Sequence, residues 1–415
     1  MTLTNRRWLI LAAGIVANLC QGVAYTSSIF MIPLGQALER PPESWSSEWG
    51  YIFAMSLAFL PVGMLLSGKL ADLGRTRLTV GVGALLYGSG LLLASMGGSV
   101  VWVAATLGVM TSVGSGCAYG TIIGAIVRWF PDRRGLAAGL AVAAVGIGPT
   151  VLAPLGAALM DAYGVLGMFR VLGIICLIAM GLAAFCIVNP PAGYVPEGWT
   201  PPAASPGTAA APRVDLHWTE MIRRPLFWLL FVTYFCGVFS GILVNGMIKP
   251  IALELAGHTS AEATGAVMLF ALASAGGRVL WGLLSDRFGR VVMVGVAFFL
   301  TAAAMLVLYG HVGTPGVFLP CVGAAGLCYG GVFGTFPSLN ADSFGVKNAA
   351  VNLAVLFTSF SLVTLVAPQV VGFYRDAGVG DYPKAFLVAG CVAVAGLILS
   401  IIVGRTIAGA GAGGK

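Results

Sequence analysis

The stretch VGMLLSGKLADLGRTR, Val62 to Arg77, ends a long apolar run with an aspartate and a group of basic residues. The stretch GGRVLWGLLSDRFGR, Gly276 to Arg290, repeats this arrangement in the second half of the chain, and the two share the pattern G-x-L-x-D. A pattern that recurs at the ends of two apolar runs indicates an internal repeat. The chain is therefore predicted to consist of two halves built in the same way.

The composition places both stretches in a membrane protein. Of the 415 residues, 58% are hydrophobic and 9% are charged, and the mean hydropathy is +0.95, whereas soluble domains contain about 25% charged residues. A bilayer core about 30 Å thick needs roughly 20 residues of helix to cross it. We therefore expect an all-α integral membrane protein with twelve transmembrane helices. Their predicted limits are 8–34, 50–68, 78–97, 100–127, 135–160, 166–189, 226–253, 262–285, 291–311, 315–341, 350–374 and 384–405.

The basic residues alternate between the two ends of these predicted helices. If the N-terminus is cytoplasmic, sixteen of the 22 lysines and arginines fall on the cytoplasmic side and five on the opposite side. This excess predicts cytoplasmic N- and C-termini in the inner (plasma) membrane. The membrane topology thus explains the net charge of +7. We expect the protein to contact a lipid bilayer and not to bind nucleic acid. The remaining basic residue, Arg278, lies deep in a span.

A stretch rich in Pro, Ala and Gly, PPAGYVPEGWTPPAASPGTAAAPRVD, separates the sixth and seventh spans. Such a composition predicts a flexible cytoplasmic linker, at 190–224, between an N-terminal six-helix bundle, 1–189, and a C-terminal one, 225–415. The motifs YGTIIG (Tyr119–Gly124) and YGGVFG (Tyr329–Gly334) stand at corresponding places in the fourth and tenth spans. We expect the two bundles to be related by a parallel, pseudo-symmetric repeat.

Two six-helix halves with a parallel repeat are typical of secondary transporters, whose site lies near the bilayer midplane between the halves. The motif GKLADLGRTR and its partial copy SDRFGR resemble the loop signature of the major facilitator superfamily. Asp72 and Asp286 in these motifs can cap helix ends and pair with neighbouring arginines, Arg75 and Arg290. We expect these four residues to form a cytoplasmic latch that rearranges as the halves move.

Arg278 interrupts the apolar stretch ASAGGRVLWG, Ala273 to Gly282. A cation at the bilayer centre costs about 3 kcal/mol or more, so it persists only beside water, a partner or a ligand. All fifteen Asp and Glu residues lie in loops or near predicted helix ends, and the neighbours of Arg278 at helical spacing are small. The planar guanidinium can donate two parallel hydrogen bonds to a carboxylate. We therefore expect Arg278 to bind an anionic substrate, the alternative being an arginine satisfied within the protein.

Three further stretches narrow the resemblance to the oxalate/formate antiporter and monocarboxylate transporter families. They are RWFPDRRGLAAGLAVAAVGIG (Arg128–Gly148), EMIRRPLFW (Glu220–Trp228) and GLCYGGVFGTFPSLNADSFG (Gly326–Gly345). The resemblance implies a cavity lined by aromatic residues. The residues it places there are Tyr119, Tyr329, Phe333 and Phe357, with Tyr25 as a further candidate.

Two of these tyrosines, Tyr119 and Tyr329, occupy matching places when the YG motifs are aligned, and could hold a ligand from opposite halves. Oxalate carriers of this kind have a lysine in the eleventh span, where Phe360 stands in this chain. The resemblance therefore implies a substrate with one carboxylate, such as lactate or pyruvate. It also implies that the acidic residue and lysine of proton-coupled relatives are absent, because Ser274 and Ile29 stand in their places.

The resulting prediction is a secondary active transporter of small monocarboxylates that works by alternating access, as a monomer and with protons as co-substrate. An anion exchanger of the oxalate/formate type is the alternative. A transporter-like sensor is a weaker alternative, because no receptor domain is visible in the sequence. The chain shows no cluster of catalytic residues, and its three histidines are scattered. We therefore expect no enzyme activity, no metal and no cofactor.

Overall fold

The computed structural model describes residues 3–191, 193–197, 199, 215–314, 316–376 and 382–412. The middle of the predicted linker, 200–214, lies outside the described residues. The regular elements of the described chain are all helical, and eleven of them are long and apolar enough to cross a membrane. Close contacts divide the chain into two units, which are described one by one below.

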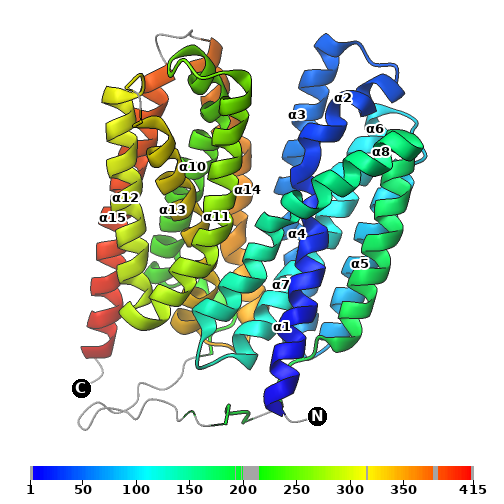
Figure 1. Ribbon diagram of the computed structural model, residues 1–415. Helices are drawn as coiled ribbons and strands as arrows, with labels where there is room; N and C mark the ends of the chain where they lie inside the picture. The colour runs from blue at the N-terminus through cyan, green and yellow to red at the C-terminus, as the bar shows by residue number, and fades with distance from the viewer. Residues whose placement is uncertain are drawn as a thin grey trace. The chain divides into compact units, whose positions relative to one another are not determined.

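Unit 1 comprises residues 1–132, 144–199 and 346–361, and its helices run side by side (Figure 1). Its first predicted span, 8–34, is three pieces, because the α-helix ends at Cys20 and the chain continues as a 3₁₀-helix. The fourth span, 100–127, contains a π-helical stretch. The elements are α1 (Leu3–Cys20), η1 (Gln21–Thr26), α2 (Ser27–Ala37), α3 (Pro42–Ala58), α4 (Leu60–Asp72), α5 (Thr76–Ala94), α6 (Val100–Val103), η2 (Ala104–Met110), α7 (Thr111–Trp129) and most of α8 (Arg134–Cys186).

Unit 2 comprises residues 133–143, 200–345 and 362–415. Local signals in the sequence set where its helices begin: Pro225 is the first residue of one helix, and Thr259 caps another by accepting a hydrogen bond from the Glu262 N–H. The elements are α9 (Trp218–Met221), α10 (Pro225–Glu254), α11 (Ser260–Phe288), α12 (Arg290–His311), α13 (Phe318–Phe344), most residues of α14 (Ala349–Asp376) and α15 (Tyr382–Ala412).

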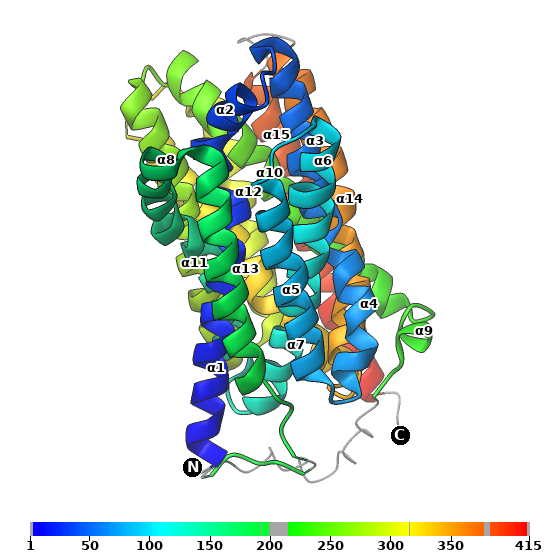
Figure 2. The same ribbon diagram turned by 90° about the vertical axis from the view of Figure 1, so that its right-hand side faces the viewer.

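Helix α8 accounts for the difference between eleven candidate spans and twelve predicted ones. It is 53 residues long but bends at Gly164, whose φ of 71° is not helical. At about 1.5 Å per residue such a helix measures roughly 80 Å, more than twice the thickness of the bilayer core. Gly164 lies between the predicted spans 135–160 and 166–189, and Figure 2 shows the two arms on either side of the bend. The fold thus contains twelve transmembrane helices.

Equivalent helix pairs in the two units are packed through glycine in the same register. A Cβ atom on Gly116 of α7 would lie less than 3.0 Å from the Leu60 carbonyl of α4. A Cβ atom on Gly330 of α13 would lie equally close to the Ser274 carbonyl of α11. In both pairs the glycine stands 56 residues after its partner, so the internal repeat extends to the backbone contacts. This register aligns position 64 with position 278.

The first residues of α8 and of α14 each pack in a different unit from most of the sequence half to which they belong. Residues 133–143, the start of α8, are part of unit 2, and residues 346–361, the start of α14, are part of unit 1. Each unit therefore differs from the predicted bundles 1–189 and 225–415 by these two segments. Below, the linker end of a unit means the end at which these segments lie. The α4–α5 and α11–α12 turns and the described parts of the linker lie at the same end.

Candidate functional site

Arg278 lies on α11 within unit 2 and is 9% exposed. Its Nη1 donates to the carbonyl of Val142, at 3.1 Å, and its guanidinium carbon lies 5.5 Å from the centre of the Phe333 ring. No ion pair of Arg278 is found within the described residues, and its Nε has no hydrogen-bond partner there. Within the described residues the guanidinium is therefore held by a backbone carbonyl and an aromatic ring.

Glycines bring two other segments against the backbone of Arg278. A Cβ atom on Gly139, in the start of α8, or on Gly334 of α13 would lie less than 3.0 Å from the Arg278 carbonyl. Small residues at such contacts let helix backbones approach closely. The same close approach brings the Val142 carbonyl within reach of the guanidinium. The glycines of the sequence motifs GLAAG and YGGVFG therefore determine where the arginine side chain is held.

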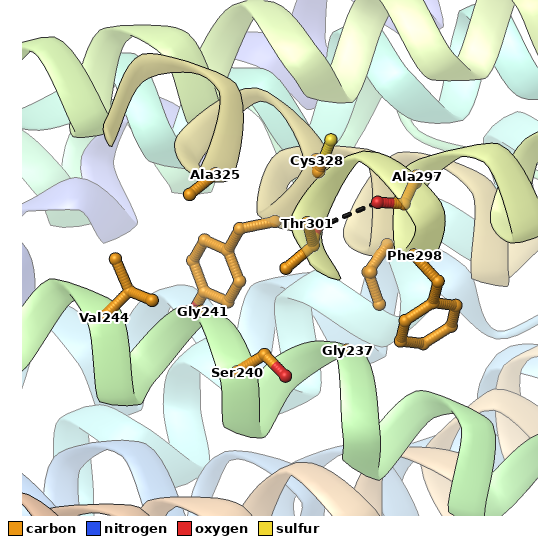
Figure 3. A pocket seen from close by; sticks show the side chains of 11 residues that line it. Gly237, Ser240, Gly241, Val244, Ala297, Phe298, Thr301, Ala325 and Cys328 are labelled. Carbon is orange, nitrogen blue, oxygen red and sulfur yellow. Dashed lines mark hydrogen bonds between the residues drawn. The ribbon is translucent and has the colours of Figure 1, made fainter. Parts of the chain in front are cut away.

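Tyr329 and Phe333 of α13 belong to the same unit as Arg278. The Tyr329 ring stacks on Phe270 at 5.6 Å and meets the edge of Phe333 at 5.2 Å, and it packs against Gly241 of α10. It lines a small cavity between α10, α12 and α13, in which the Thr301 hydroxyl donates to the Ala297 carbonyl (Figure 3). Its free volume of about 10 Å³ has room for one water molecule and is too small for an organic anion.

The other aromatic candidates lie in unit 1. The Tyr119 ring is 5.7 Å from that of Phe357, which lies 6.4 Å from that of Phe360, and all three side chains are buried. Tyr25 lies on η1 and is 42% exposed. Within unit 1 the structure therefore gathers three of the four candidates into one aromatic group.

The predicted correspondence of Tyr119 with Tyr329 is wrong by one helical turn. Gly120 packs on Met64 and Gly334 packs on Arg278, and each glycine stands 56 residues after its partner. The residue of unit 2 that matches Tyr119 is therefore Phe333. The error arises because glycines recur every four residues in both helices, so the YG motifs also align with a shift of one turn.

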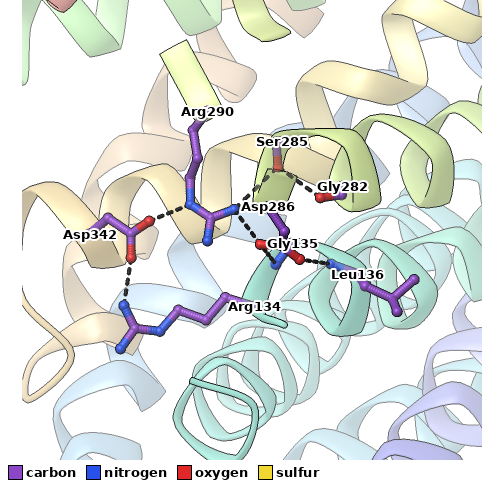
Figure 4. A network of polar contacts seen from close by, with 8 residues as sticks. All are labelled: Arg134, Gly135, Leu136, Gly282, Ser285, Asp286, Arg290 and Asp342. Atoms are coloured by element: carbon purple, nitrogen blue, oxygen red, sulfur yellow. Dashed lines mark hydrogen bonds and ion pairs between the residues drawn. The ribbon is translucent and has the colours of Figure 1, made fainter. Parts of the chain in front are cut away.

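A charged cluster holds the start of α8 at the linker end of unit 2 (Figure 4). The Asp286 carboxylate accepts hydrogen bonds from the N–H groups of Gly135 and Leu136, both at 2.9 Å, and pairs with Arg290 at 3.0 Å. The predicted capping role and the predicted arginine partner are both found here. Capping is favourable because the first N–H groups of a helix have no partner within the helix and its dipole attracts negative charge.

Two members of this unit 2 cluster were missed by the sequence analysis. The Asp342 carboxylate at the end of α13 pairs with Arg290 and also with Arg134, the first residue of α8. The three positions are far apart in the chain, and each looks like an ordinary charge at a helix end. The only signal was that Arg134 lies in RWFPDRRG and Asp342 in NADSFG, both within stretches that resemble a transporter family.

A second cluster holds the start of α14 in unit 1. The Asp72 carboxylate accepts hydrogen bonds from the N–H groups of Ala350 and Val351, at 3.1 and 3.0 Å. Its arginine partner is Arg128, at the end of α7, and not the predicted Arg75. Arg75 is exposed at the start of α5, and no ion pair joins its side chain to another described residue. Its backbone N–H donates to the Leu70 carbonyl and ends the tight turn after α4.

Twelve apolar spans in two repeated units, with a buried cation and charged clusters at the linker end, are the features of a membrane transporter. The chain belongs to the Major Facilitator Superfamily, whose sequence profile matches residues 13–368. The family and the fold are those of transporters and not of enzymes.

Similar proteins with described roles agree with this assignment. The oxalate:formate antiporter of Oxalobacter formigenes is 27% identical over 84% of this chain and 80% of its own length. Monocarboxylate transporter 11 of Homo sapiens is 25% identical over 97% of this chain and 84% of its own length. The crystal structure of the Escherichia coli fucose:proton symporter has a TM-score of 0.70 at 15% identity, over 95% of this chain and 98% of that one. The structural likeness supports the fold alone.

Proposed function

We propose that the protein is a secondary active transporter of small monocarboxylates, such as lactate or pyruvate, and that it couples their movement to protons. The observation that supports this most is Arg278, a buried cation with no ion pair within the described residues. A carboxylate that docks there supplies the missing negative charge and lowers the cost of holding the cation away from water. The names of the two sequence relatives, which concern small organic anions, point to the same substrate class.

A single carboxylate suits Arg278 better than two, because one guanidinium supplies one positive charge. The resemblance to oxalate carriers points the same way, since Phe360 stands where those carriers have a lysine, and Phe360 is buried in unit 1. An apolar ring at that position leaves a second carboxylate without a partner. The substrate class that follows is a small anion with one charge and a compact carbon skeleton.

The proposed mechanism is alternating access with the substrate as part of the gate. When the anion docks on Arg278, the buried charge is neutralised, which favours closure of the two halves around it and reopening on the other side. The proton travels with the anion in the proposed symport. We place both termini in the cytoplasm, because sixteen basic residues fall at the ends of helices on that side and five on the other. The protein works as a monomer in the inner (plasma) membrane.

An anion exchanger of the oxalate/formate type is the second candidate, and the absence of a titratable partner for Arg278 within the described residues favours it. The test uses purified protein in proteoliposomes with an alkaline lumen and no internal substrate. Uptake of labelled L-lactate that collapses with the pH gradient supports proton symport. Uptake that requires preloading with unlabelled anion identifies an exchanger. No lactate or pyruvate uptake under either condition contradicts the proposed substrate class.

A further inference from the structure

The first residues after α8 lie against the linker end of unit 1. The Thr76 hydroxyl, at the start of α5, donates to the carbonyl of Ile187 at 3.0 Å. The indole N–H of Trp129, at the end of α7, donates to the carbonyl of Val188 at 2.6 Å. The next residue, Asn189, is half-buried and uses both ends of its amide. We call residues 187–189 the strap.

Asn189 joins the end of α4 to the arginine of the unit 1 cluster. Its Nδ2 donates to the carbonyl of Ala71, at 3.1 Å, and its Oδ1 accepts from Nη1 of Arg128, also at 3.1 Å. A carbonyl only accepts hydrogen bonds and a guanidinium only donates them, so these two partners determine which way the amide points. Asn189 therefore fixes Arg128 relative to the residue that precedes Asp72.

Every nitrogen of Arg128 has a partner, and the strap supplies one of them. Nε donates to the Val346 carbonyl at 2.9 Å, and Nη2 pairs with Asp72 and donates to the Lys347 carbonyl at 2.9 Å. Val346 and Lys347 immediately precede α14, whose first N–H groups bond to Asp72. The arginine thus ties the start of α14 to α4, and Asn189 holds the remaining nitrogen, Nη1.

In unit 2 an ion pair occupies the same place. In the register that aligns position 64 with position 278, Thr76 corresponds to Arg290 and Arg128 corresponds to Asp342. In unit 2 these two side chains form an ion pair with each other. In unit 1 a hydroxyl and a guanidinium cannot do so, and both bond to the strap instead. The strap therefore occupies the place of the missing ion pair.

From this substitution we propose that Asn189 is a positioning residue for the unit 1 cluster, through which the linker controls release of the start of α14. While the strap is bound, Arg128 is held in the orientation that reaches Asp72 and the two carbonyls before α14. When the strap leaves, Nη1 loses its partner and the arginine becomes free to rotate away. Loss of the strap thus weakens the contact between α4 and the start of α14.

The test measures amide hydrogen exchange in the full-length protein, resolved to peptides that contain the start of α14. Asn189→Ala is expected to speed exchange at Ala350 and Val351 about tenfold or more, the effect of losing one hydrogen bond to a charged group. Asn189→Asp keeps an oxygen facing Arg128 and is expected to stay within about twofold of the parent chain. Val195→Ala, an exposed change in the same segment, is the matched control and is expected to change nothing.

Faster exchange confined to the peptides after α8 would mean that Asn189 only anchors the linker, and would overturn the proposal. Exchange at the start of α14 equal to that of the parent chain would overturn it as well. If Asn189→Ala does not fold, Thr76→Val replaces it, because it removes the hydroxyl that holds the strap at Ile187. That variant is then expected to speed exchange at Ala350 and Val351, and unchanged exchange would contradict the proposal.

A second readout rests on the proposed transport function. Asn189→Ala is expected to change the maximal rate of lactate uptake at least twofold, because the strap acts on a conformational step. The KM is expected to stay within about twofold, because Asn189 is not one of the proposed substrate-binding residues. A change confined to KM would contradict a positioning role. Failure of the parent chain to transport lactate would count against the proposed function and leave the exchange experiment unaffected.

Discussion

Arg278 shows how an arginine is accommodated inside an apolar helix. Its guanidinium donates one hydrogen bond to the Val142 carbonyl and lies over the Phe333 ring. A hydrogen bond to a charged group contributes about 1.5–3 kcal/mol and a cation–π contact about 0.5–2 kcal/mol. These values are close to the lower estimate, about 3 kcal/mol, for placing the charge in the membrane. The protein thus nearly offsets the cost, and a bound anion adds stabilisation.

Arg278→Gln is expected to reduce lactate uptake about 100-fold or more, because a charge-assisted pair of hydrogen bonds to the carboxylate is lost. Glutamine removes the charge and keeps an unbranched side chain with a polar amide, so the protein is expected to fold. Uptake into proteoliposomes and the unfolding midpoint in detergent are measured together. Arg170→Gln, at an exposed position of α8, is the control. Parent-like uptake by the Arg278 variant would exclude this arginine from the substrate site.

The sequence was sufficient to single out Arg278, because a lone cation in a span is visible without any structure. It was not sufficient to find Arg128 as the partner of Asp72, because the pairing depends on how α7 lies against α4. The contact between Asp342 and Arg134 was invisible for the same reason. Side chains brought together by tertiary packing leave no local pattern in the chain.

At the scale of helices, glycine determines how closely α11 and α13 approach. Gly334→Ala is expected to destabilise the protein by about 1–3 kcal/mol, because its Cβ would overlap the Arg278 carbonyl and force the helices apart. Gly276→Ala, where no atom lies within 4 Å, is expected to be neutral or stabilising because alanine favours a helix. Unfolding midpoints of the two variants are compared, and equal midpoints would mean that the helices separate without cost.

The start of α8 provides a second test at this scale. Asp286→Asn is expected to lower the unfolding midpoint by a few degrees, because the neutral amide no longer pairs with Arg290 and interacts weakly with the helix dipole. Amide exchange at Gly135 and Leu136 is expected to become faster in the same variant. Asp161→Asn, at an exposed position on the same helix, serves as the control. No change in either measurement would show that the cap contributes nothing.

The helices were largely predictable from apolar runs of sufficient length, but their interruptions were not. The first predicted span is broken where α1 ends at Cys20, whose carbonyl accepts a hydrogen bond from the Tyr87 hydroxyl at 3.1 Å. That bond joins residues 67 positions apart, so nothing near Cys20 in the sequence indicates it. The π-helical stretch η2 lies within an apolar run that reads as a regular helix. Hydropathy detects a span, whereas tertiary hydrogen bonds decide its internal geometry.

For the whole molecule, the charge pattern predicts which side of the membrane each turn faces. Leu73 and Met96 are both about 70% exposed and lie just beyond opposite ends of α5, whose 19 residues measure about 28 Å. In intact cells, a membrane-impermeant maleimide is expected to label Met96→Cys and not Leu73→Cys, each in a chain from which the native cysteines are removed. Permeabilised cells should show labelling of both. The reverse pattern would invert the proposed topology.

The two units themselves could be anticipated only in part. The Pro-rich stretch and the repeat suggested a division near the linker, and most helices follow it. The starts of α8 and α14 do not, because Asp286 and Asp72 hold their first N–H groups in the other unit. An aspartate that caps its own helix and one that caps a distant helix look alike in a sequence, so this exchange of segments became visible only in three dimensions.

This exchange also matters for how the protein can be produced in pieces. A fragment that stops in the linker contains the first turns of α8 but lacks Asp286, the carboxylate that caps them. The complementary fragment contains the first turns of α14 but lacks Asp72. Neither half of the chain contains a complete unit, and each half supplies a short segment that the other unit requires. Co-expressed fragments would therefore need to associate before either fold is complete. A fragment produced alone would keep one helix start without its aspartate cap.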